Sequence, residues 1–498
     1  MRPSAAPLLL LAITAGYADG AIIRGTVVEK RTNYSLSRAS VTLETVPAVG
    51  DQARTARTNE TGQFEFANLP AGAYIIKASR RGFMPMEYGQ RRWNSAGTAI
   101  IVRDDDSLSL QLPLARFGAI TGTVRDNNEV GIPDQDVAAY TTTQPPRYVA
   151  RAKADDRGVF RIGGLEPGDY LIRTTGNTDE DRSYLPTFSR QTLRVEEARP
   201  LVVYADEDTP DGDVRPISGK LFDLSGGVTV PPGNFNITIT LASEMGRTFS
   251  SGPAFRFTGL APGRYEIYAE AVEGAPGMRV LGGYTDIPLD RNQTNFVLPM
   301  QDTRDTQFAL EGAGPSVSAT ALVRRKDYAG VGAAREVRLS ALGRVQLFPG
   351  RWEIMVQPPA GYYVASFSPR VRNSSAVPQG WNEVLISGYS RISASLSSGP
   401  GSLQGTVHIS NMPAIAAPVF LETWDPVTRA RLTELQKTRT DVQGNYKFGG
   451  LAPGNYRLLS TFEYTSPDPQ AFDVDETRGI RVESATNAQV DLELSGMP

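Results

Sequence analysis

The sequence has no cysteine and a single histidine, His408. Disulfides, thiolate nucleophiles and cysteine zinc sites are therefore excluded, and so is any metal site that needs two histidines. A Ser-His-Asp triad would have to use His408. That residue lies in "GTVHISN", a stretch typical of a strand, and we expect its side chain at the surface of a domain. No cofactor and no metal are expected.

An excess of charge of either sign is also lacking. The chain has 51 Lys and Arg against 54 Asp and Glu, which gives a formal net charge of -3. No block of Lys or Arg indicates a basic groove, so nucleic acid is not an expected partner.

One long apolar run, Ala5 to Ala15, lies in "MRPSAAPLLLLAITAGYADG", after Arg2 and before small residues. This pattern is typical of a secretory signal peptide, residues 1–18, removed after Ala18. The alternative is a frayed hydrophobic tail. The run is too short to span a bilayer, and no later run is long enough for a membrane helix. We expect an exported protein, periplasmic, on the outer surface or extracellular, with no membrane-spanning segment after signal removal.

Glycine and proline are abundant, with 48 and 35 residues in a chain of 498. This composition suits many short strands joined by tight turns. The length exceeds what one hydrophobic core supports, so several domains are expected. The best candidate for a helix, residues 428–440, falls where other parts of the chain repeat strands, and we interpret it as strand and loop.

An octet rich in Gly and Pro recurs as "GGLAPGNY" (449–456), "TGLAPGRY" (258–265) and "GGLEPGDY" (163–170), with looser copies at 67–74 and 346–352. The aromatics that close the five copies are 87 to 104 residues apart: Tyr74, Tyr170, Tyr265, Trp352 and Tyr456. Stretches typical of an opening strand repeat with the same period around four glycines, and 308–323 fills the one empty place: Gly25, Gly122, Gly219 and Gly405. Repeats of this size predict five domains rather than a solenoid.

The stretch "DVQGNYKFGGLAPGNYRLL" (441–459) shows what one octet does. Its first Asp and Gly favour a turn, after which Tyr446 and Phe448 alternate toward one face of a strand. A second turn follows, and the alternation resumes at Tyr456. The pattern predicts half-buried antiparallel strands, with the aromatic after the turn packed inward and its hydroxyl bonded to nearby backbone. In the fourth unit, Trp352 would have to place its N–H differently.

The order G-[TK]-[VL], then N/D-x-x-G-x-[FY]-x-[FI]-x-x-L-x-x-G-x-Y, resembles the carboxypeptidase regulatory-like domains. These are close in fold to the transthyretin-like and Cna-B-type modules. The resemblance covers residues 22–114, 117–210, 214–300 and 402–495, and the fourth unit only loosely. It implies prealbumin-like or carbohydrate-binding-like β-sandwiches that serve as accessory modules for spacing or adhesion.

We therefore expect an all-β chain, a tandem array of about five Ig-like or prealbumin-like antiparallel β-sandwich domains. The signal peptide is followed by the expected domains, the fourth of them divergent: 19–115, 116–213, 214–302, 303–399 and 400–498. Five sandwiches use the whole chain, and no domain of catalytic size is left over.

The family name does not imply an activity, because a zinc carboxypeptidase needs two histidines and a glutamate around the metal. The resemblance to Cna-B-type modules also implies a Lys–Asn isopeptide bond in some units. Threonine stands at the expected lysine position in three units, at Thr26, Thr123 and Thr406. Only Lys220, in the third unit, offers an amine there.

The stretch "MEYGQRRWN" (86–94) brings Tyr88, Arg91, Arg92 and Trp93 into one expected loop. Aromatic faces stack on sugar rings and arginine binds hydroxyls, so these four residues form a candidate glycan platform. The favoured alternative is a loop whose tryptophan caps the domain or packs on its neighbour. The same two interpretations apply to Trp381 and Trp424, which stand alone in the sequence.

The acidic stretch "DEDTPDGD" (206–213) resembles a calcium loop at first sight. An EF-hand loop needs an acidic or amide residue at its fifth position, Gly at the sixth and Glu at the twelfth. Here Pro210 takes the fifth place, Gly212 comes one residue late, and Ile217 stands where the Glu belongs. We interpret the stretch as an acidic linker between the second and third units.

The sequence favours a non-catalytic, exported bacterial protein that binds or scaffolds in the cell envelope or extracellular space. Its partner would be a polysaccharide or an envelope protein. The alternative is a carbohydrate-binding protein that uses the loop aromatics Trp93 and Tyr88. An enzyme with two opposed carboxylates is the third interpretation.

Overall fold

The computed structural model describes residues 20–46, 53–179, 182–274, 279–302, 306–312, 314, 316–339, 342–345, 347–368, 378–386 and 390–496. The expected signal peptide lies outside these ranges. The chain divides into two compact units, one mainly of residues up to Leu114 and one mainly of residues from Ala115 onward, and each is treated by itself. Within the described ranges, no helix is long and apolar enough to cross a membrane.

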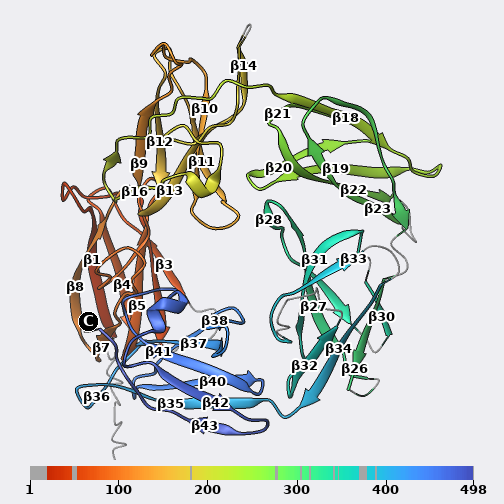
Figure 1. Ribbon diagram of the computed structural model, residues 1–498. Coiled ribbons are helices and arrows are strands. Elements are labelled where there is room, and N and C mark those ends of the chain that lie inside the picture. The colour runs from red at the N-terminus through yellow and green to blue at the C-terminus, as the bar shows by residue number, and fades with distance from the viewer. Residues whose placement is uncertain are drawn as a thin grey trace, which may run out of the picture. The chain divides into compact units, whose positions relative to one another are not determined.

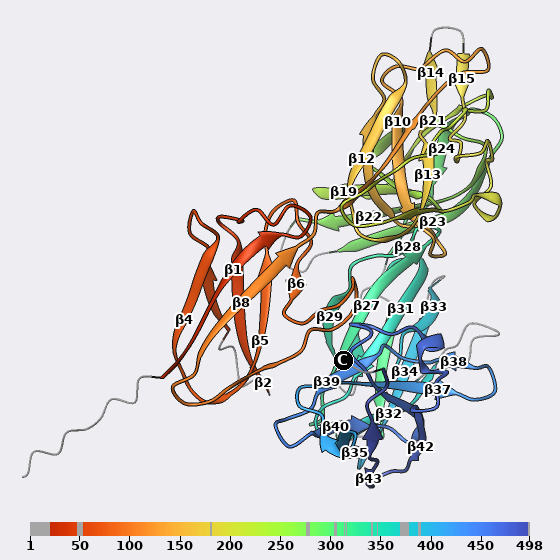
Figure 2. The same cartoon turned by 90° about the vertical axis from the view of Figure 1, so that its left-hand side faces the viewer.

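Module 1 consists of two sheets, ordered β4-β1-β8 and β3-β2-β5-β6, with β7 paired to β5. In the first sheet, β1 lies between β4, which is antiparallel to it, and β8, which is parallel (Figure 2). The strands of module 1 are β1 (Ala21–Glu29), β2 (Ser40–Val46), β3 (Arg54–Arg57), β4 (Gln63–Leu69), β5 (Gly72–Ser79), β6 (Met86–Glu87), β7 (Ile100–Val102) and β8 (Ser107–Leu114).

Modules 2 and 3 repeat this arrangement (Figure 1). Module 2 contains β9 (Gly118–Thr123), β10 (Asp136–Thr141), β11 (Tyr148–Lys153), β12 (Val159–Leu165), β13 (Gly168–Thr174), β14 (Asn177–Asp179), β15 (Arg182–Tyr184), the 3-10 turn η1 (Val195–Glu197), β16 (Leu201–Val203) and β17 (Asp208–Thr209). Module 3 contains β18 (Phe222–Val228), β19 (Phe235–Ser243), β20 (Gly246–Ser251), β21 (Ala254–Leu260), β22 (Gly263–Glu273), β23 (Val280–Leu289), β24 (Gln293–Leu298) and β25 (Gln301–Asp302).

Modules 4 and 5 complete the series. Module 4 contains β26 (Thr306–Glu311), β27 (Ala319–Asp327), β28 (Gly330–Val331), β29 (Arg335–Leu339), β30 (Leu342–Arg344), β31 (Gly350–Gln357), β32 (Tyr362–Ser368), β33 (Asn382–Ile386) and β34 (Ser390–Ser398). Module 5 contains β35 (Gly401–Ile409), β36 (Met412–Pro413), β37 (Pro418–Asp425), β38 (Ala430–Arg431), β39 (Gln436–Arg439), β40 (Asn445–Leu451), β41 (Gly454–Ser460), the 3-10 turn η2 (Pro469–Phe472), β42 (Arg478–Val482), β43 (Asn487–Gln489) and β44 (Leu492–Glu493).

The opening strand has the same place in every module. It lies within its sheet, with an antiparallel partner on one side and, on the other, a parallel partner from near the end of the module. The flanking pairs are β4 and β8, β12 and β17, β21 and β24, β30 and β34, and β40 with β43 and β44. The expectation of an all-β chain of tandem sandwiches is thus confirmed. Residues 428–440 contain strands β38 and β39 and no helix.

A glycine in the opening strand allows the sheet to pack closely. Gly25 lies opposite Phe64, and a Cβ on it would come within 2.5 Å of that ring. A Cβ on Gly405 would come within 1.8 Å of the Val490 carbonyl oxygen on the parallel partner side. Contacts this short exclude any side chain larger than hydrogen at these positions. They explain why a glycine recurs in the opening strand.

In module 3 this glycine is Gly226, and the expected marker Gly219 was wrong. Gly226 pairs with Phe255, and its Cβ would come within 1.9 Å of the Phe296 carbonyl oxygen. Gly219 precedes β18, where its amide donates to the Ser183 carbonyl of module 2. The sequence "SGGV" rather than "SGKL" therefore corresponds to "RGTV" of the first module.

The same correction removes Lys220 as an isopeptide donor. Lys220 is exposed and lies before β18, whereas the residue that follows the strand glycine in module 3 is Gly227. No amine stands at that position of the opening strand. Residues just before it pair with module 2 instead, since Val214 bridges Val124 and Ser218 bridges Tyr184.

Alternation along the strands builds each core. In module 2, the side chains of Phe160 and Ile162 on β12 are buried while their neighbours Val159 and Arg161 are exposed. On β13, Ile172 belongs to the same core. Burying such a side chain contributes about 1.5–3 kcal/mol. The cores therefore hold the two sheets of each module together and fix which residues face outward.

Candidate functional site

The five aromatics that close the octets share one hydrogen bond. Each donates its side-chain O–H or N–H to the backbone carbonyl four residues earlier, across the turn, at 2.7–2.9 Å. The pairs are Tyr74 to Pro70, Tyr170 to Glu166, Tyr265 to Ala261, Trp352 to Phe348 and Tyr456 to Ala452. Trp352 was expected to place its N–H differently, but its indole reaches the same carbonyl position. The octet is a structural corner.

Replacing Tyr456 by phenylalanine should destabilise module 5 by about 1 kcal/mol, because one buried hydrogen bond is lost. Burial of this phenol is strong enough to raise the pKa of Tyr456 to about 12. Hydrogen–deuterium exchange of β40 and β41 measures the change. Tyr464→Phe, at a more exposed position of the same module, should leave this exchange unaltered. Equal exchange in wild type and Tyr456→Phe would contradict the role of the corner.

The side chain that follows the corner aromatic lies on the outer face of its strand. On β22, Ile267 and Ala269 lie in the core of module 3, so Glu266 and Tyr268 must lie on the outer face. Glu266 is nevertheless 0% exposed and Tyr268 8%. The outer face of β22 is therefore covered, and the residues that cover it come from module 4.

Glu266 is the centre of a hydrogen-bonded cluster between modules 3 and 4. Its Oε1 accepts from Arg351 at 2.6 and 3.1 Å and from the Tyr284 hydroxyl at 2.9 Å. Its Oε2 accepts from the Tyr328 amide at 2.7 Å. Tyr284 is on β23 of module 3, whereas Arg351 and Tyr328 belong to module 4. The buried carboxylate is thus bound by groups of both modules at once.

A second buried carboxylate runs the opposite way, from module 4 to module 3. The side chain of Asp327, at the end of β27, is 0% exposed. Arg247 of module 3 binds it in a bidentate manner at 2.7 and 2.8 Å, and Tyr268 donates to it at 3.1 Å. Burial, followed by the nearby Asp327 charge, raises the pKa of Tyr268 to about 12. The phenol therefore stays a donor across the neutral range.

Arg325 lies near both of these carboxylates. Its guanidinium lies 3.8 Å from the ring centroid of Tyr268 and 5.6 Å from that of Trp352. Nη1 donates to the Pro349 carbonyl at 3.0 Å, and burial lowers the pKa of this guanidinium. Cation–π contacts in such desolvated surroundings contribute about 2 kcal/mol. We call Glu266, Arg351, Asp327, Arg247 and Arg325 the junction cluster.

Apolar packing accompanies the junction cluster. Val280, on β23 of module 3, belongs to the same buried cluster as Phe348 of module 4. A Cβ on Gly282 would come within 2.5 Å of the Phe348 side chain. Modules 3 and 4 therefore share a core edge as well as charges, and this junction is a solid interface.

Module 5 also has buried charged side chains on the outer face of a sheet, but a segment of module 5 itself covers them. Glu422 on β37 is 0% exposed and accepts from Arg457 and Arg431, each at 2.6 Å. Arg457 is the residue after the corner aromatic, and its guanidinium also lies 5.3 Å from the ring of Phe472 in η2. The segment that contains η2 thus takes the place that module 4 takes on module 3.

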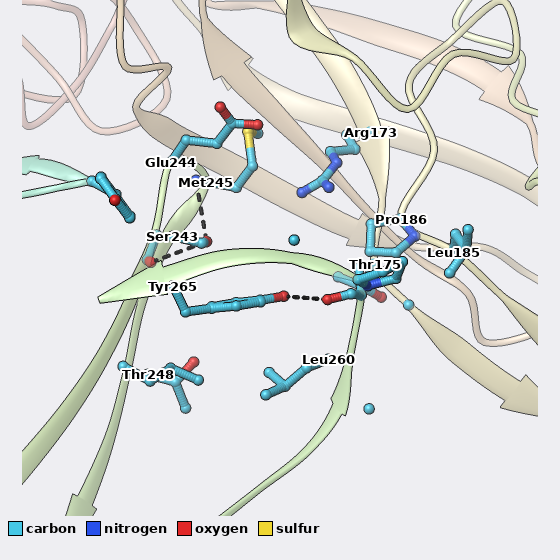
Figure 3. A pocket seen from close by; sticks show the side chains of 18 of the residues that line it. Arg173, Thr175, Leu185, Pro186, Ser243, Glu244, Met245, Thr248, Leu260 and Tyr265 are labelled. Carbon is cyan, nitrogen blue, oxygen red and sulfur yellow. Dashed lines mark hydrogen bonds between the residues drawn. The ribbon is translucent and has the colours of Figure 1, made fainter. Parts of the chain in front are cut away.

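A pocket of about 780 Å³ lies between modules 2 and 3. Figure 3 shows Arg173 on one side of this space and the ring of Tyr265 on the opposite side, with Met245 and Glu244 lining its edge. Leu185 and other small or apolar side chains complete the wall. The volume falls within the range of about 300–1,000 Å³ that is typical of ligand sites.

The loop predicted as a glycan platform lies between β6 and β7. Its shape is set by Glu87, whose carboxylate accepts from the Gly97 amide at 2.9 Å, and by Ser95, whose hydroxyl donates to the Arg92 carbonyl at 2.9 Å. Arg91 and Arg92 are exposed. Tyr88 and Trp93 are half-buried, as are the strand residues of β6. The four predicted residues therefore share one ordered loop.

The strands of module 1 coincide with the part of the chain that matches a protein-family model, residues 22–114. The model is that of the carboxypeptidase regulatory-like domain. Module 1 is therefore similar to this domain.

The chain is also similar to serine-aspartate repeat-containing protein D of Staphylococcus aureus, from the strains Newman and MW2. The two match with 25% identity over 284 residues, 50% of this chain and 21% of the relative. The chain thus spans about a fifth of the length of these curated relatives. Among solved structures, the minor pilin of Streptococcus agalactiae has 13% identity and a TM-score of 0.27, covering 40% of this chain and 97% of that one. The shaft pilin SpaA of Lactobacillus rhamnosus GG has 12% identity and a TM-score of 0.23, covering 41% and 99%.

Outside module 1, both lone tryptophans have arginine partners. Arg324 lies 3.7 Å from the ring centroid of Trp381, and the Trp381 indole donates to Glu434 at 2.9 Å. Arg457 lies 3.5 Å from the ring of Trp424. A stacked guanidinium covers one face of each ring, so neither residue presents two free faces to a sugar.

The interpretation of the acidic stretch 206–213 as a linker was wrong. The stretch contains β17, the last strand of module 2, and the residues on either side of it. Asp208 on β17 pairs with Arg161 at 2.8 Å, and Asp213 accepts from the Thr123 amide at 2.7 Å. Its carboxylates hold β17 beside β9. In the described part of the chain, no group of three or more His, Asp or Glu side chains is placed to hold a metal ion.

Proposed function

We propose that this protein is a non-catalytic, exported scaffold of the bacterial envelope or extracellular space, in which modules 3 and 4 act as one rigid body. The observation that carries the proposal is the junction cluster, in which buried charged side chains of modules 3 and 4 bind one another across the interface. Breaking such a buried ion pair from one side is strongly destabilising, so the pairs favour one docked geometry of the two modules. A protein that keeps its modules at fixed spacing suits presentation of a partner at a set distance.

Export is tested by producing the full chain in a bacterial host. We expect the material outside the cytoplasm to begin at Asp19, because the N-terminal run has the pattern of a cleaved signal peptide. N-terminal sequencing or intact-mass measurement of the two fractions reads this out. Full-length chain confined to the cytoplasm would overturn the export part of the proposal.

Carbohydrate binding through the loop of module 1 is the second candidate. It is favoured by one observation, the ordered loop that keeps Trp93 and Tyr88 half-buried beside the exposed Arg91 and Arg92. Stacking on aromatic rings and hydrogen bonds from arginine are what a sugar surface needs.

A pull-down of residues 19–498 on insoluble polysaccharides and on peptidoglycan tests this candidate. Retention should fall at least tenfold in Trp93→Ala if the loop binds glycan. Tyr34→Ala removes another aromatic of module 1, 73% exposed, and should leave retention unchanged. No retention of the wild type on any matrix counts against glycan binding and leaves the scaffold.

A further inference from the structure

We propose that the pocket between modules 2 and 3 binds an acidic sugar, a hexuronic acid unit, through Arg173. This site is separate from the Trp93 loop and does not depend on it.

Arg173 is a half-buried cation that no carboxylate of the described residues pairs with. It is on the outer face of β13, where one side of its guanidinium packs on the Phe188 ring, 5.2 Å from the centroid. Nε has no hydrogen-bond partner, although the Tyr140 hydroxyl and the Glu244 carboxylate lie near enough to act on the guanidinium. Burying an unpaired charge is costly. Arg351 and Arg457, two other partly buried arginines of the second unit, each bind a glutamate, whereas the buried Arg325 stacks on the Tyr268 ring instead.

The guanidinium is directed into the pocket rather than into a core. Figure 3 shows it opposite the ring of Tyr265, whose hydroxyl is already committed to the Ala261 carbonyl. Burial lowers the pKa of the Arg173 guanidinium, and the nearby Tyr140 phenol and Glu244 carboxylate only partly oppose this. A ligand carboxylate in this space would meet the fork of donors that arginine presents to planar anions.

The remaining wall suits a sugar ring better than a simple organic acid. Leu260, Leu185 and the face of Tyr265 offer apolar surface for the C–H face of a pyranose. Thr175 and Thr248 offer neutral hydroxyls for hydrogen bonds to sugar hydroxyls. A small dicarboxylate would leave most of this surface unused. One cation, two hydroxyls and an apolar surface in the pocket match the carboxylate, the hydroxyls and the C–H face of a uronic acid.

The charge of the pocket also favours an anion. Four charged side chains line it: Arg173, Arg247, Arg264 and Glu244. Arg247 is neutralised by Asp327 in the junction cluster. Arg173 and Arg264 then outnumber Glu244, which is exposed at the edge. Glu244 would compete weakly with the ligand for Arg173, and this gives the test a variant of opposite sign.

Titration calorimetry of residues 19–498 with digalacturonate, and with neutral galactobiose as the comparison, tests the site. We expect digalacturonate to bind at least tenfold more tightly than galactobiose, and 0.5 M salt to weaken it. Arg173→Gln should reduce affinity at least tenfold, and Arg173→Lys should reduce it less. Glu244→Gln should increase affinity two- to fivefold because a competing anion is removed.

Arg151→Gln is the matched control, since it removes one exposed arginine from β11 of the same module. It should leave the affinity unchanged, and circular dichroism melting of each variant confirms that module 2 is folded. Wild-type protein that binds neither sugar at millimolar concentration would overturn the proposal. Equal affinity in Arg173→Gln, or succinate binding as tightly as digalacturonate, would overturn it as well.

Discussion

Replacing Glu422 by alanine should lower the free energy of unfolding of module 5 by about 3–5 kcal/mol, because two arginines lose their buried carboxylate and only Arg457 keeps another, the half-exposed Asp473. Glu422 is 0% exposed, and Arg457 and Arg431 each donate to it at 2.6 Å. Their side chains are only 11% and 18% exposed, so water cannot replace the lost partner. Hydrogen–deuterium exchange of β37 and β41 in the intact chain measures the loss.

Glu483→Ala is the control for this prediction. Its ion pair with Arg481 is in the same module, but the two side chains are 60% and 72% exposed. Exposed pairs contribute about 0–1 kcal/mol, so the exchange rates should hardly change. If Glu422→Ala and Glu483→Ala had equal effects, the buried cluster of module 5 would not support the module as described.

The largest loss of docking energy between modules 3 and 4 should follow Glu266→Ala. The substitution removes the acceptor for Arg351, Tyr284 and the Tyr328 amide together. Breaking a buried pair from one side costs about 3–5 kcal/mol. Because the partners lie on two modules, we expect this energy to be lost from docking, with each sandwich still folded around its own core.

Exchange measurements separate docking from folding. Amides near Tyr328 and along the outer edge of β23 should lose protection in Glu266→Ala, while the core strands β19 and β27 keep theirs. Glu311→Ala removes an exposed pair of module 4, with Arg391 at 3.7 Å, and should change neither region. Global loss of protection throughout module 3 would instead mean that Glu266 is needed for folding of the sandwich.

The sequence predicted the sandwiches because their signals are local. A turn, an alternating pair of aromatics and a second turn lie within about twenty residues, so one copy of the octet is enough to place two strands. The marker glycine failed in module 3 for a similar reason. "ISGKLF" looks more like an opening strand than "LSGGVT", and only the contacts of Gly226 with Phe255 and Phe296 reveal which glycine is in the sheet.

The junction cluster could not be found in this way. Alternation assigns Glu266 and Glu422 to the outer face of a strand, where a glutamate is normally solvated. Both are buried because another segment covers that face: module 4 in one case and the η2 segment in the other. Arg173 was missed for the same reason. A pattern of period two tells which face a side chain takes, but not what lies against that face.

The rigid junction of modules 3 and 4 is tested most directly by a distance measurement between them. Because the chain has no cysteine, Thr294→Cys and Ser366→Cys place a spin label at one exposed strand position in each module. Double electron–electron resonance should give one narrow distance distribution, which broadens in Glu266→Ala. A broad distribution in the otherwise unchanged chain, equal to that of Glu266→Ala, would contradict a scaffold in which these two modules move as one.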